Sequence, residues 1–390
     1  MRLFLQANDT FFFRDGRPFT KGDQSEGYSI FPPLPSTILG ALRSAYIAEH
    51  GDLPSFYNGK MKEIIGTPKP DSLGSMHLKG VFLADRNRES RIYYPIPLDL
   101  VTKNEEKENK LYVLERSPEK SNFISNSPLN HYLRWDKDDE DVESETSGRL
   151  IHLYLRQYLL GKKTTFRLSP IENFVCDELK IGIERDYKTL TSKDNMLYRI
   201  NMRRFQSLKT DMSELGFVVD YKCAEKLSKN GLLKLGGEGK SFTYERSSHN
   251  PDPLKKEEDM QALKHSICSS RAFKLYFATP AIFKNGWLPK WIRKNTDKNI
   301  YKAEYKSLSF ELKTAAVGKP ISIGGWDMKK NMPKPTRQAI PAGSVYYFKI
   351  SDETCVNTIL KTFHYKNISD YQAAEGFGLC FVGVAEGDKL

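Results

Sequence analysis

The chain has 390 residues, of which 39% are hydrophobic and 12% aromatic. This composition supplies enough apolar surface for packed cores, so it excludes a globally disordered chain, and the length favours two or three domains. The 60 lysines and arginines exceed the 49 acidic residues and give a formal charge of +11. Such a balance favours an acidic partner such as nucleic acid, but an ordinary basic surface has the same charge.

Several other classes of protein lack support in the sequence. The five cysteines form no Cys-x-x-Cys pair, which predicts reduced, buried thiols instead of disulfides or a zinc site. The histidines form no HxxxH pattern, so we expect no metal and no other cofactor. The N-terminus lacks the apolar core of a signal peptide, and no apolar run is long enough to span a membrane. We therefore predict a cytoplasmic protein without membrane contact.

The beginning of the chain predicts a strand, a long structured loop and a helix. Leu3 and Leu5 alternate with other residues over 1–7, as in a strand with at least one buried face. The prolines at 32, 33 and 35 keep the next stretch extended. Ser36 is the predicted N-cap of a helix that Gly51 ends. Its apolar stripe consists of Ile38, Leu39, Leu42, Ala45 and Tyr46.

Strands dominate the rest of the chain. We expect them at 78–84, 92–98, 180–183, 196–205, 216–221, 232–235, 272–277, 310–316, 339–350 and 378–384, with helices at 149–160 and 356–364. Residues 101–147 are the least ordered in this prediction and end in an acidic run, 136–145, interpreted as a solvated loop. The polar break at 247–264 is the preferred domain boundary. The order of elements indicates an α+β fold and is compatible with ferredoxin-like units, but periodicity does not separate these from other α+β layouts.

The segment TFFFRDGRPFTKGDQSEGYSIFPPLPSTILGALR at 10–43 is the first candidate site. Its framing cations are Arg14, Arg17, Lys21 and Arg43. On the predicted helix, Ser36 and Gly40 share a face with Arg43, where an arginine and free N–H groups suit a phosphate. A packing site for a small residue beside a solvated arginine explains this face equally well.

The segment LYRINMRRF at 197–205 gives a sharper pattern. In a strand, Arg199, Asn201 and Arg203 occupy one face, and Tyr198, Ile200 and Met202 occupy the other. One apolar face and one arginine-lined face favour an RNA platform. An edge strand protected by charges remains the alternative.

Three glycine-rich segments are further candidates. LLKLGGEGKSF at 232–242 is not a P-loop, but Gly236, Gly237 and Gly239 with Lys240 suit a backbone curled around a phosphate; a hairpin turn is the alternative. The long segment 322–348 combines an aromatic residue with cations, as base stacking and charge neutralisation require. Its candidate residues are Gly324, Gly325, Trp326, Lys330 and Arg337. GFGLCFVG at 376–383, with Gly376 and Gly378, lies between a helix and a strand, which does not support a dinucleotide site.

Seven blocks occur in a fixed order between residues 11 and 383. They are FxRDGRPF, FPPLPSTILGALR, IGIERD…TSKDNMLYRI, LGGEGK, IGGWD, IPAGSVYYF and GFGxxxxG. In this order the sequence resembles the RAMP superfamily, and within it the third RAMP subunit of the type III-B (Cmr) CRISPR–Cas RNA-targeting effector complex. The acidic segment 136–145 belongs to none of these blocks.

The resemblance implies an antiviral-defence protein with two ferredoxin-like, RRM-related domains carrying long loop insertions. We place these domains at 1–250, with an insertion around 101–147, and at 265–390. The implied role is non-catalytic: to bind the 5′ repeat-derived tag of the guide RNA and to dock the large polymerase/cyclase-like subunit and a backbone RAMP subunit, meeting target RNA only indirectly. The glycine-rich loops would be places where main chain closely meets RNA or sheet.

The resemblance also transfers individual residues. The positions carried over as RNA-binding are Arg14, Arg17, Ser36, Thr37, Arg43, Lys240, Trp326 and Arg337. Lys240 stands where the family motif often has arginine, so it keeps the charge but loses the bidentate fork. Two other hypotheses stay open: a RAMP-type endoribonuclease that processes precursor guide RNA, which would need an acid–base pair, and a scaffold that meets only acidic proteins. No GxSxG motif is present, and nothing in the sequence indicates a catalytic pair.

Overall fold

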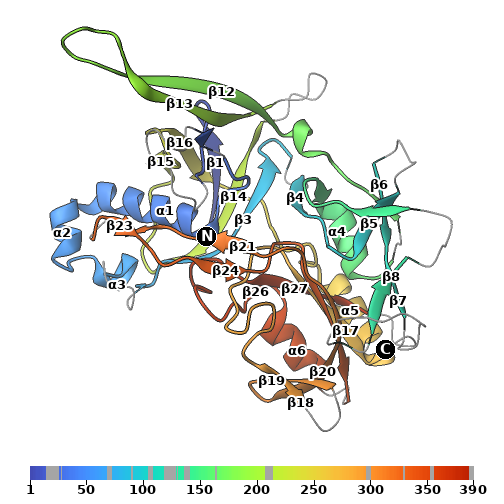
Figure 1. Ribbon diagram of the computed structural model, residues 1–390. Coiled ribbons are helices and arrows are strands. Elements are labelled where there is room, and N and C mark those ends of the chain that lie inside the picture. Colours follow the sequence, from blue (N-terminus) through green and yellow to red (C-terminus); the bar gives the residue numbers. More distant parts are fainter. Residues whose placement is uncertain are drawn as a thin grey trace. The chain divides into compact units, whose positions relative to one another are not determined.

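A computed structural model describes residues 1–14, 26–27, 29–67, 73–88, 91–103, 109–117, 129, 131–135, 141–162, 165–206, 214–295, 300–327, 330–351 and 355–385. The chain divides into two compact units, each assembled from segments far apart in sequence (Figure 1). Unit 1 comprises Met1–Glu89, Glu172–His249 and Ser322–Arg337. Unit 2 comprises Ser90–Ile171, Asn250–Ile321 and Gln338–Leu390.

Unit 1 contains an antiparallel sheet with the strand order β3-β14-β1-β16-β15. Its strands are β1 (Arg2–Ala7), β3 (His77–Asp85), β14 (Leu215–Lys222), β15 (Asn230–Lys234) and β16 (Ser241–Arg246). Strand β1 has a neighbour on each side, and Leu3, Phe4 and Leu5 are all buried. The predicted N-terminal strand is therefore a central strand buried on both faces.

Helix α1 (Pro35–His50) packs against this sheet through the predicted apolar stripe, all of which is buried. The predicted N-cap is wrong, because Leu34 occupies that position and Ser36 lies inside the first turn. Pro35 at the first helical position explains the shift, since its fixed φ suits the helix and its missing N–H costs nothing there. Gly51 ends the helix as predicted, and its N–H donates to the carbonyl of Ile47 at 2.9 Å. The short helices α2 (Leu53–Tyr57) and α3 (Lys62–Ile65) follow.

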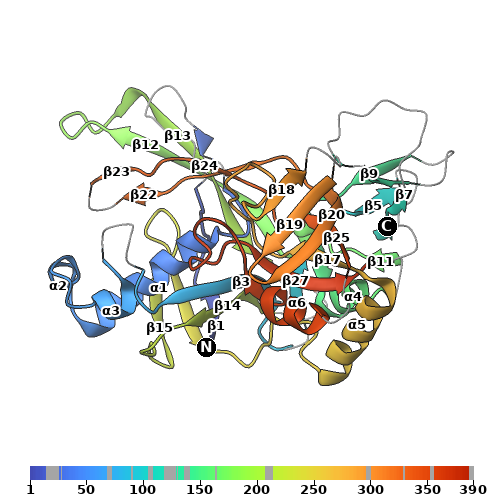
Figure 2. The ribbon, with the colours of Figure 1, turned by 90° about the horizontal axis from the view of Figure 1, so that it is seen from below.

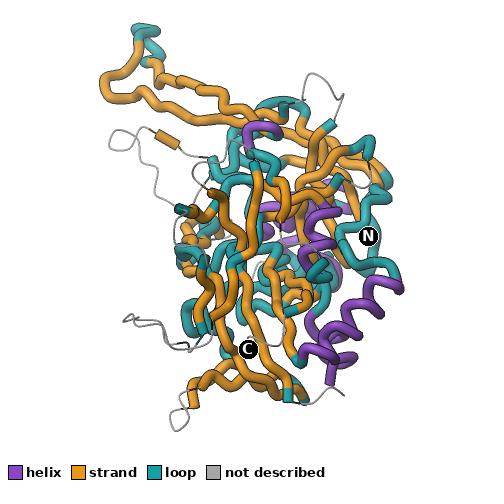
Figure 3. The backbone as a smooth tube through the Cα atoms, turned by 90° about the vertical axis from the view of Figure 1, so that its right-hand side faces the viewer, coloured by secondary structure: helices purple, strands orange, loops and turns teal. Residues whose placement is uncertain are grey.

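A long antiparallel ribbon extends from unit 1 (Figures 1 and 3). It consists of β12 (Val175–Arg185) and β13 (Ser192–Phe205), and we call it the arm. The short strand β2 (Glu26–Gly27) pairs with β13 in parallel. A second, smaller hairpin of unit 1 joins β22 (Trp326–Asp327) to β23 (Met332–Pro333).

Unit 2 is built on an antiparallel sheet with the order β18-β19-β20-β25-β17-β27-β26. Its strands are β17 (Ala272–Phe277), β18 (Ile292–Asn295), β19 (Ile300–Tyr305), β20 (Leu308–Ala316), β25 (Val345–Ile350), β26 (Lys366–Asn367) and β27 (Leu379–Val384). Helices α5 (Glu257–Ser270) and α6 (Val356–Phe363) pack against it (Figure 2). The core beneath them is aromatic and includes Phe273, Trp291, Phe310, Phe348 and Phe363.

The first segment of unit 2 is more regular than predicted. Its elements are β4 (Ile92–Pro95), β5 (Leu100–Lys103), β6 (Lys110–Val113), β7 (Glu115–Ser117), β8 (Tyr132–Arg134), β9 (Val142–Ser144), β10 (Arg149–Ile151), α4 (His152–Leu159) and β11 (Thr165–Arg167). The predicted helix at 149–160 is thus wrong in its first turn, because residues 149–151 pair with β4 as a strand. Residues 136–140 of the acidic run lie outside the described residues, and β9 contains part of the remainder.

The remaining described elements are η1 (Ile171–Asn173), β21 (Ile321–Ile323) and β24 (Arg337–Ala339). The predicted strand at 339–350 is divided between β24 and β25. Pro341 has no N–H to donate, and Gly343 has a φ of +96°, so the chain turns there. No helix among the described residues is long and apolar enough to cross a membrane.

The α+β class is confirmed, because antiparallel sheets dominate and helices are few. In chain order, β1, β3, β14 and β16 occupy the spatial order 2-3-1-4, and so do β17, β20, β25 and β27. Unit 1 has a helix after its first strand and none in residues 223–229, whereas unit 2 has α6 after its third strand. Since neither unit has both helices of a ferredoxin-like unit in the described residues, that fold stays a prediction.

The two units differ in their boundaries from the domains predicted from the sequence. Residues 90–171, which fall within the predicted first domain, group with unit 2. The predicted break at 247–264 includes the point between His249 and Asn250 where the chain passes from unit 1 to unit 2. The domain assignment 1–250 and 265–390 itself stays a prediction.

Candidate nucleic-acid interface

The three phenylalanines of the opening segment belong to the core of unit 1. Phe11, Phe12 and Phe13 are at most 6% exposed. The rings within 6.5 Å of Phe11 are those of Phe13, Phe31, Phe205, Phe217 and Phe242. Phe12 instead packs on Ile200 and Met202 of the arm. Phe11, Phe12 and Phe13 therefore anchor the segment and the root of the arm, and none of these three rings is available to stack on a base.

Backbone contacts pair the end of this segment, at Arg14, with residues that precede α1. The N–H of Ile30 donates to the carbonyl of Phe13 at 2.8 Å, and the N–H of Phe13 donates to Ser29 Oγ at 3.2 Å. Arg14 forms a β-bridge with Ser29 and is exposed. The two ends of the loop thus run side by side just before the helix. Arg17 and Lys21 lie outside the described residues.

The glycine-rich segment is the turn of the β15–β16 hairpin, as the structural alternative predicted. The N–H of Gly237 donates to the carbonyl of Phe12 at 2.8 Å. At Gly236, with φ +91°, an added Cβ would lie 2.5 Å from that same oxygen, so only glycine fits. Gly239 also has a positive φ, but the space around it is open. Two of the three predicted glycines therefore serve close packing on the phenylalanine segment.

Lys240 is engaged within the protein. Its ammonium forms a salt bridge with the carboxylate of Asp9, which adjoins the phenylalanine segment. The hydrogen bond from Lys240 holds the pKa of Asp9 below its usual value. A second ion pair, between Lys180 Nζ and Glu238 Oε2 at 2.7 Å, ties the arm to the glycine loop. In the free chain, the Lys240 side chain thus links the glycine loop to the residues that precede the phenylalanine segment.

The arm has the two faces that the sequence predicted. Ile200 and Met202 are buried on the side that covers Phe12, while Arg199 on the other side is exposed. Near the root, Arg203 Nε lies 3.2 Å from Asp177 Oδ1, and its guanidinium lies 5.7 Å from the centre of the Phe31 ring. Asp177 Oδ2 also accepts a hydrogen bond from the Asn201 amide at 3.0 Å.

An apolar row on the arm was missed by the sequence analysis. Leu179, Ile181 and Ile183 are 61%, 57% and 51% exposed. Leu179 pairs with Asn201 and Ile181 with Arg199, and directly opposed residues share a face, so this row lies beside the arginines. The i, i+2, i+4 spacing in ELKIGIER was the available signal. At the tip, the side chain of Tyr187 is 94% exposed.

The predicted face of α1 is open but only partly cationic. Gly40 is exposed, and an added Cβ would meet nothing within 4 Å, so the packing alternative is wrong for this glycine. Arg43 Nη2 donates to the carbonyl of Leu73 at 3.3 Å, which holds the guanidinium against the protein. Ser36 and Thr37 are half-buried in the first turn.

The β22–β23 hairpin presents the predicted aromatic and basic side chains to solvent. Trp326 is 54% exposed, and Lys330 in the turn is also exposed, as is Arg337 at the start of β24. The Asp327 carboxylate accepts the N–H of Lys330 at 3.0 Å and shapes the turn. Gly324 is half-buried, and Gly325 is exposed with its carbonyl accepting the N–H of Lys334 at 2.9 Å.

Gly376 and Gly378 are buried in unit 2, where packing accounts for both. The carbonyl of Gly376 accepts the Thr279 hydroxyl at 2.8 Å. An added Cβ at Gly378, with φ +72°, would lie 2.4 Å from the backbone nitrogen of Ser369. This is a close approach of main chain to main chain, and the prediction that these two glycines let main chain closely meet RNA or sheet stays untested as regards RNA.

The described residues form neither a metal-binding cluster nor a disulfide. Among them, no group of three histidine, cysteine or acidic side chains is placed to hold a metal ion. None of the five cysteines, all of which are described, forms a disulfide; Cys380 is buried, as predicted, and the other four are only half-buried. Burial raises the pKa of the Cys380 thiol, which keeps it protonated.

Comparison with known proteins decides the family. A family model described as "CRISPR-associated protein (Cas_Cmr3)" matches residues 3–385. The chain belongs to the Cas_Cmr3 family. This confirms the predicted resemblance, and it makes the chain a subunit of a type III-B CRISPR effector complex.

Two solved structures resemble this Cas_Cmr3 family member. One is described as "Cryo-EM structure of the Type III-B Cmr-beta bound to cognate target RNA and AMPPnP, state 1", with 15% identity and a TM-score of 0.48 over 93% of this chain and 89% of that chain. The other, "Cryo-EM structure of the Type III-B Cmr-beta bound to cognate target RNA", has 14% identity and the same TM-score and coverage. A search of curated proteins finds no match.

The predicted RNA-binding side chains of this Cas_Cmr3 family member gather in one unit. All of those that the structure describes lie in unit 1, namely Arg14, Ser36, Thr37, Arg43, Arg199, Arg203, Lys240, Trp326, Lys330 and Arg337. They come from three separate stretches of the chain, which sequence spacing alone did not connect. Of the predicted positions, Gly376 and Gly378 belong to unit 2.

Proposed function

We propose that this chain is the non-catalytic RNA-binding subunit that holds the 5′ repeat-derived tag of the guide RNA in its type III-B effector complex. In the same proposal it docks the large polymerase/cyclase-like subunit and a backbone RAMP subunit. The observation that carries the proposal is the gathering of the described candidate side chains in unit 1. There the phenylalanine segment, the glycine loop and the root of the arm are bonded to one another.

These internal bonds support a preformed surface. Phe12 contacts both the glycine loop and the arm, so these elements hold their positions before RNA arrives. A surface organised in advance loses less conformational freedom when it binds a flexible single strand. The proposal therefore assigns Lys240 and Arg203 mainly to fixing this surface, since both already pair with carboxylates.

The exposed part of the surface combines charge with apolar area. Arg14 and Arg199 are exposed, and Arg199 lies beside Ile181 on the arm. Arginine suits phosphate, and exposed apolar side chains suit the faces of unpaired bases and sugars. Trp326 with Lys330 offers the same pairing on the β22–β23 hairpin. Single-stranded RNA meets both requirements.

The test is binding of the purified chain to tag RNA and to a scrambled RNA of equal length across a salt series. We expect the tag preference to persist at high salt. Replacing both Arg14 and Arg199 (Arg14→Ala, Arg199→Ala) lowers the magnitude of the salt slope by about 0.7 for each lost phosphate contact. Arg293→Ala, at an exposed arginine of unit 2, is the matched control and leaves the slope unchanged. An unchanged slope in the double variant, or equal binding of both RNAs, contradicts the proposal.

The runner-up, a RAMP-type endoribonuclease, is tested by incubating the isolated chain with labelled repeat RNA, with and without magnesium. We expect intact RNA, because the histidines described in unit 1 are engaged in local contacts. His249, for example, is buried and bonds the carbonyl of Asp85 at 2.8 Å. Product that accumulates with time, and that disappears in a variant of a candidate acid or base, would establish the nuclease instead.

A further inference from the structure

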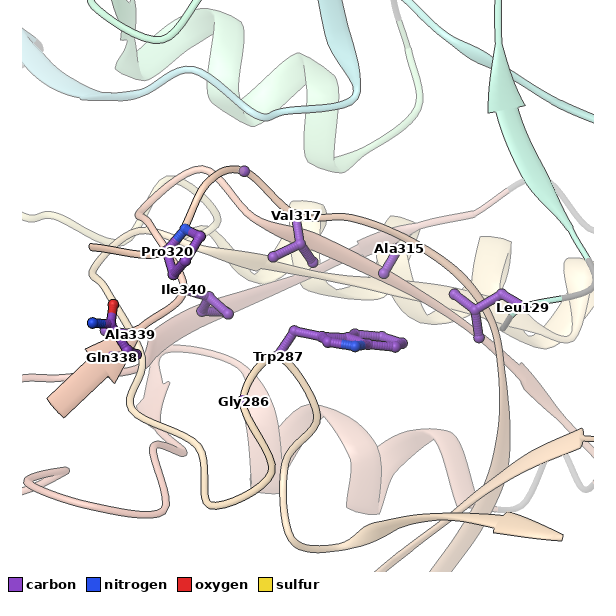
Figure 4. A pocket seen from close by; sticks show the side chains of 10 residues that line it. Leu129, Gly286, Trp287, Ala315, Val317, Pro320, Gln338, Ala339 and Ile340 are labelled. Carbon is purple, nitrogen blue, oxygen red and sulfur yellow. The ribbon is translucent and has the colours of Figure 1, made fainter. Parts of the chain in front are cut away.

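Unit 2 contains an apolar pocket of about 490 Å³ that none of the predicted sites uses. Figure 4 shows the flat ring of Trp287 along one side, with Val317 and Ala315 facing it and Pro320 and Ile340 continuing the apolar wall. Gln338 contributes an amide, and none of the lining residues carries a charge. The pocket therefore offers carbon surface and one aromatic face.

The pocket wall is held in place by hydrogen bonds within unit 2. The Tyr346 hydroxyl donates to the carbonyl of Trp287 at 2.5 Å, and the two rings stack with centres 6.4 Å apart. Lys284 and Lys290 flank Trp287 on its loop. Their backbone N–H groups donate to the Asp370 carboxylate, from another part of unit 2, at 3.0 Å and 2.8 Å. A loop fixed on both sides of Trp287 keeps the pocket formed in the free chain, which favours binding.

The exposed charged side chains that stand within three residues of a lining residue are all positive, and the half-buried Asp370 carboxylate is already bonded to N–H groups of the Trp287 loop. Lys284, Lys290 and Lys319 are exposed and stand within three residues of lining residues. No lining residue and no described residue directly adjacent to one carries a carboxylate. Acidic groups on either side of an apolar group would therefore complement this part of the surface.

We propose that this pocket receives an aromatic or large aliphatic side chain from a partner protein, flanked in that partner by acidic residues. Apolar pockets with a rigid aromatic wall are places where anchor side chains contribute strongly to an interface. A nucleobase fits less well, because its polar edge atoms would be buried with Gln338 as the only amide side chain to meet them, and unpaired polar atoms are costly. The inference goes beyond the proposed grip on RNA, since it needs no RNA contact.

The experiment uses the full chain and three short peptides in ligand-observed NMR titrations. The probe is N-acetyl-Glu-Phe-Glu-amide, and its controls are N-acetyl-Lys-Phe-Lys-amide and N-acetyl-Glu-Ala-Glu-amide. We expect the acidic phenylalanine peptide to bind about fivefold more tightly than the lysine peptide, the difference that a pair of exposed charges supplies. The alanine peptide should show no binding, because it lacks the anchor.

Two variants locate the binding. Val317→Trp fills the pocket and should weaken the acidic phenylalanine peptide by about tenfold or more. Gln338→Glu changes an exposed side chain, so it leaves the fold intact, and its negative charge should weaken the same peptide but not the lysine peptide. No binding, or binding that neither variant alters, overturns the proposal. Tighter binding of adenosine or uridine monophosphate, lost in Val317→Trp, would make this a nucleotide pocket instead. Because no tag RNA is present, failure here is separate from failure of the proposed function.

Discussion

The two units each contain an aspartate paired with a cation, in opposite surroundings. In unit 2, Asp99 is fully buried, accepts hydrogen bonds from the hydroxyls of Tyr158 and Tyr347, and lies 3.9 Å from Lys274 Nζ. In unit 1, Asp177 holds Arg203 at the root of the arm, where the two side chains are 56% and 23% exposed. The same pairing of charges therefore has different consequences.

Burial decides what each pair does. The ammonium of Lys274 also lies 3.3 Å from the centre of the Tyr158 ring, so every group in this cluster depends on its neighbours. Water reaches Asp177 and Arg203, which screens their attraction and allows a competing anion to take the arginine. Unit 2 thus keeps this pair away from water, where it can only serve structure, while the Asp177–Arg203 pair of unit 1 stays partly accessible to water and to other ions.

The largest expected effect comes from Asp99→Asn. It leaves Lys274 buried without a countercharge, and we expect the free energy of unfolding to fall by about 3–5 kcal/mol in chemical denaturation. Adding Lys274→Met to this variant removes the stranded charge and should restore part of the loss. Glu63→Gln, at a side chain that is 84% exposed, is the control with no effect. A loss below about 1 kcal/mol in Asp99→Asn would show that the cluster is not a structural charge network.

An intermediate effect is expected from acidification of unit 2. Burial lowers the pKa of His152 to about 4, whereas an unfolded histidine has a pKa of about 6.5. The unfolded state therefore binds more protons between these values, and stability falls as the pH drops below about 6.5. Between pH 7 and pH 5 this group should cost about 2 kcal/mol.

His152→Gln isolates this contribution from other titrating groups. The variant should lose about 2 kcal/mol less than the wild type over the same pH interval, as measured by denaturation at both pH values. Tyr94, whose hydroxyl lies 3.1 Å from His152 Nδ1, keeps its hydrogen bond to the carbonyl of Pro251 in the variant. Equal losses in the two proteins would contradict the assigned pKa shift.

The smallest expected effect comes from Asp177→Asn in unit 1. Because the pair is partly exposed, the free energy of unfolding should change by less than about 1 kcal/mol. The released Arg203 should instead increase the magnitude of the RNA salt slope, by up to about 0.7 for one added phosphate contact. Glu304→Gln, which releases Lys302 in unit 2, is the matched control and should leave the slope unchanged. If the RNA salt slope of Asp177→Asn also stays unchanged, Arg203 makes no phosphate contact and only stabilises the root of the arm.

Much of the fold was readable from local pattern. The apolar stripe of α1, its end at Gly51 and the two-faced strand β13 were predicted because each depends on residues a few positions apart. Predictions failed where a local pattern was ambiguous. Residues 149–151 fit either a helix or a strand, and pairing with β4 decided for the strand.

The sequence predicted which types of residue occur at the candidate site, but it did not predict which of them pair with other side chains and which are exposed. Basic and aromatic side chains were found, but the sequence did not show that Lys240 would pair with Asp9 or Arg203 with Asp177. The exposed row of Leu179, Ile181 and Ile183 was missed, because an alternating apolar strand normally indicates a buried face.

By itself, the sequence determined the α+β class, the main strands and helices, the family and the net positive charge of the chain, since these depend on composition, spacing and ordered motifs. Only the tertiary structure decided that the three phenylalanines are core, that residues 90–171 join the second unit, and that an apolar pocket forms beside Trp287. The physical reason is that burial and ion pairing are set by neighbours in space. Asp9 and Lys240, which are 231 positions apart, become neighbours only when β1 and β16 pair in the sheet.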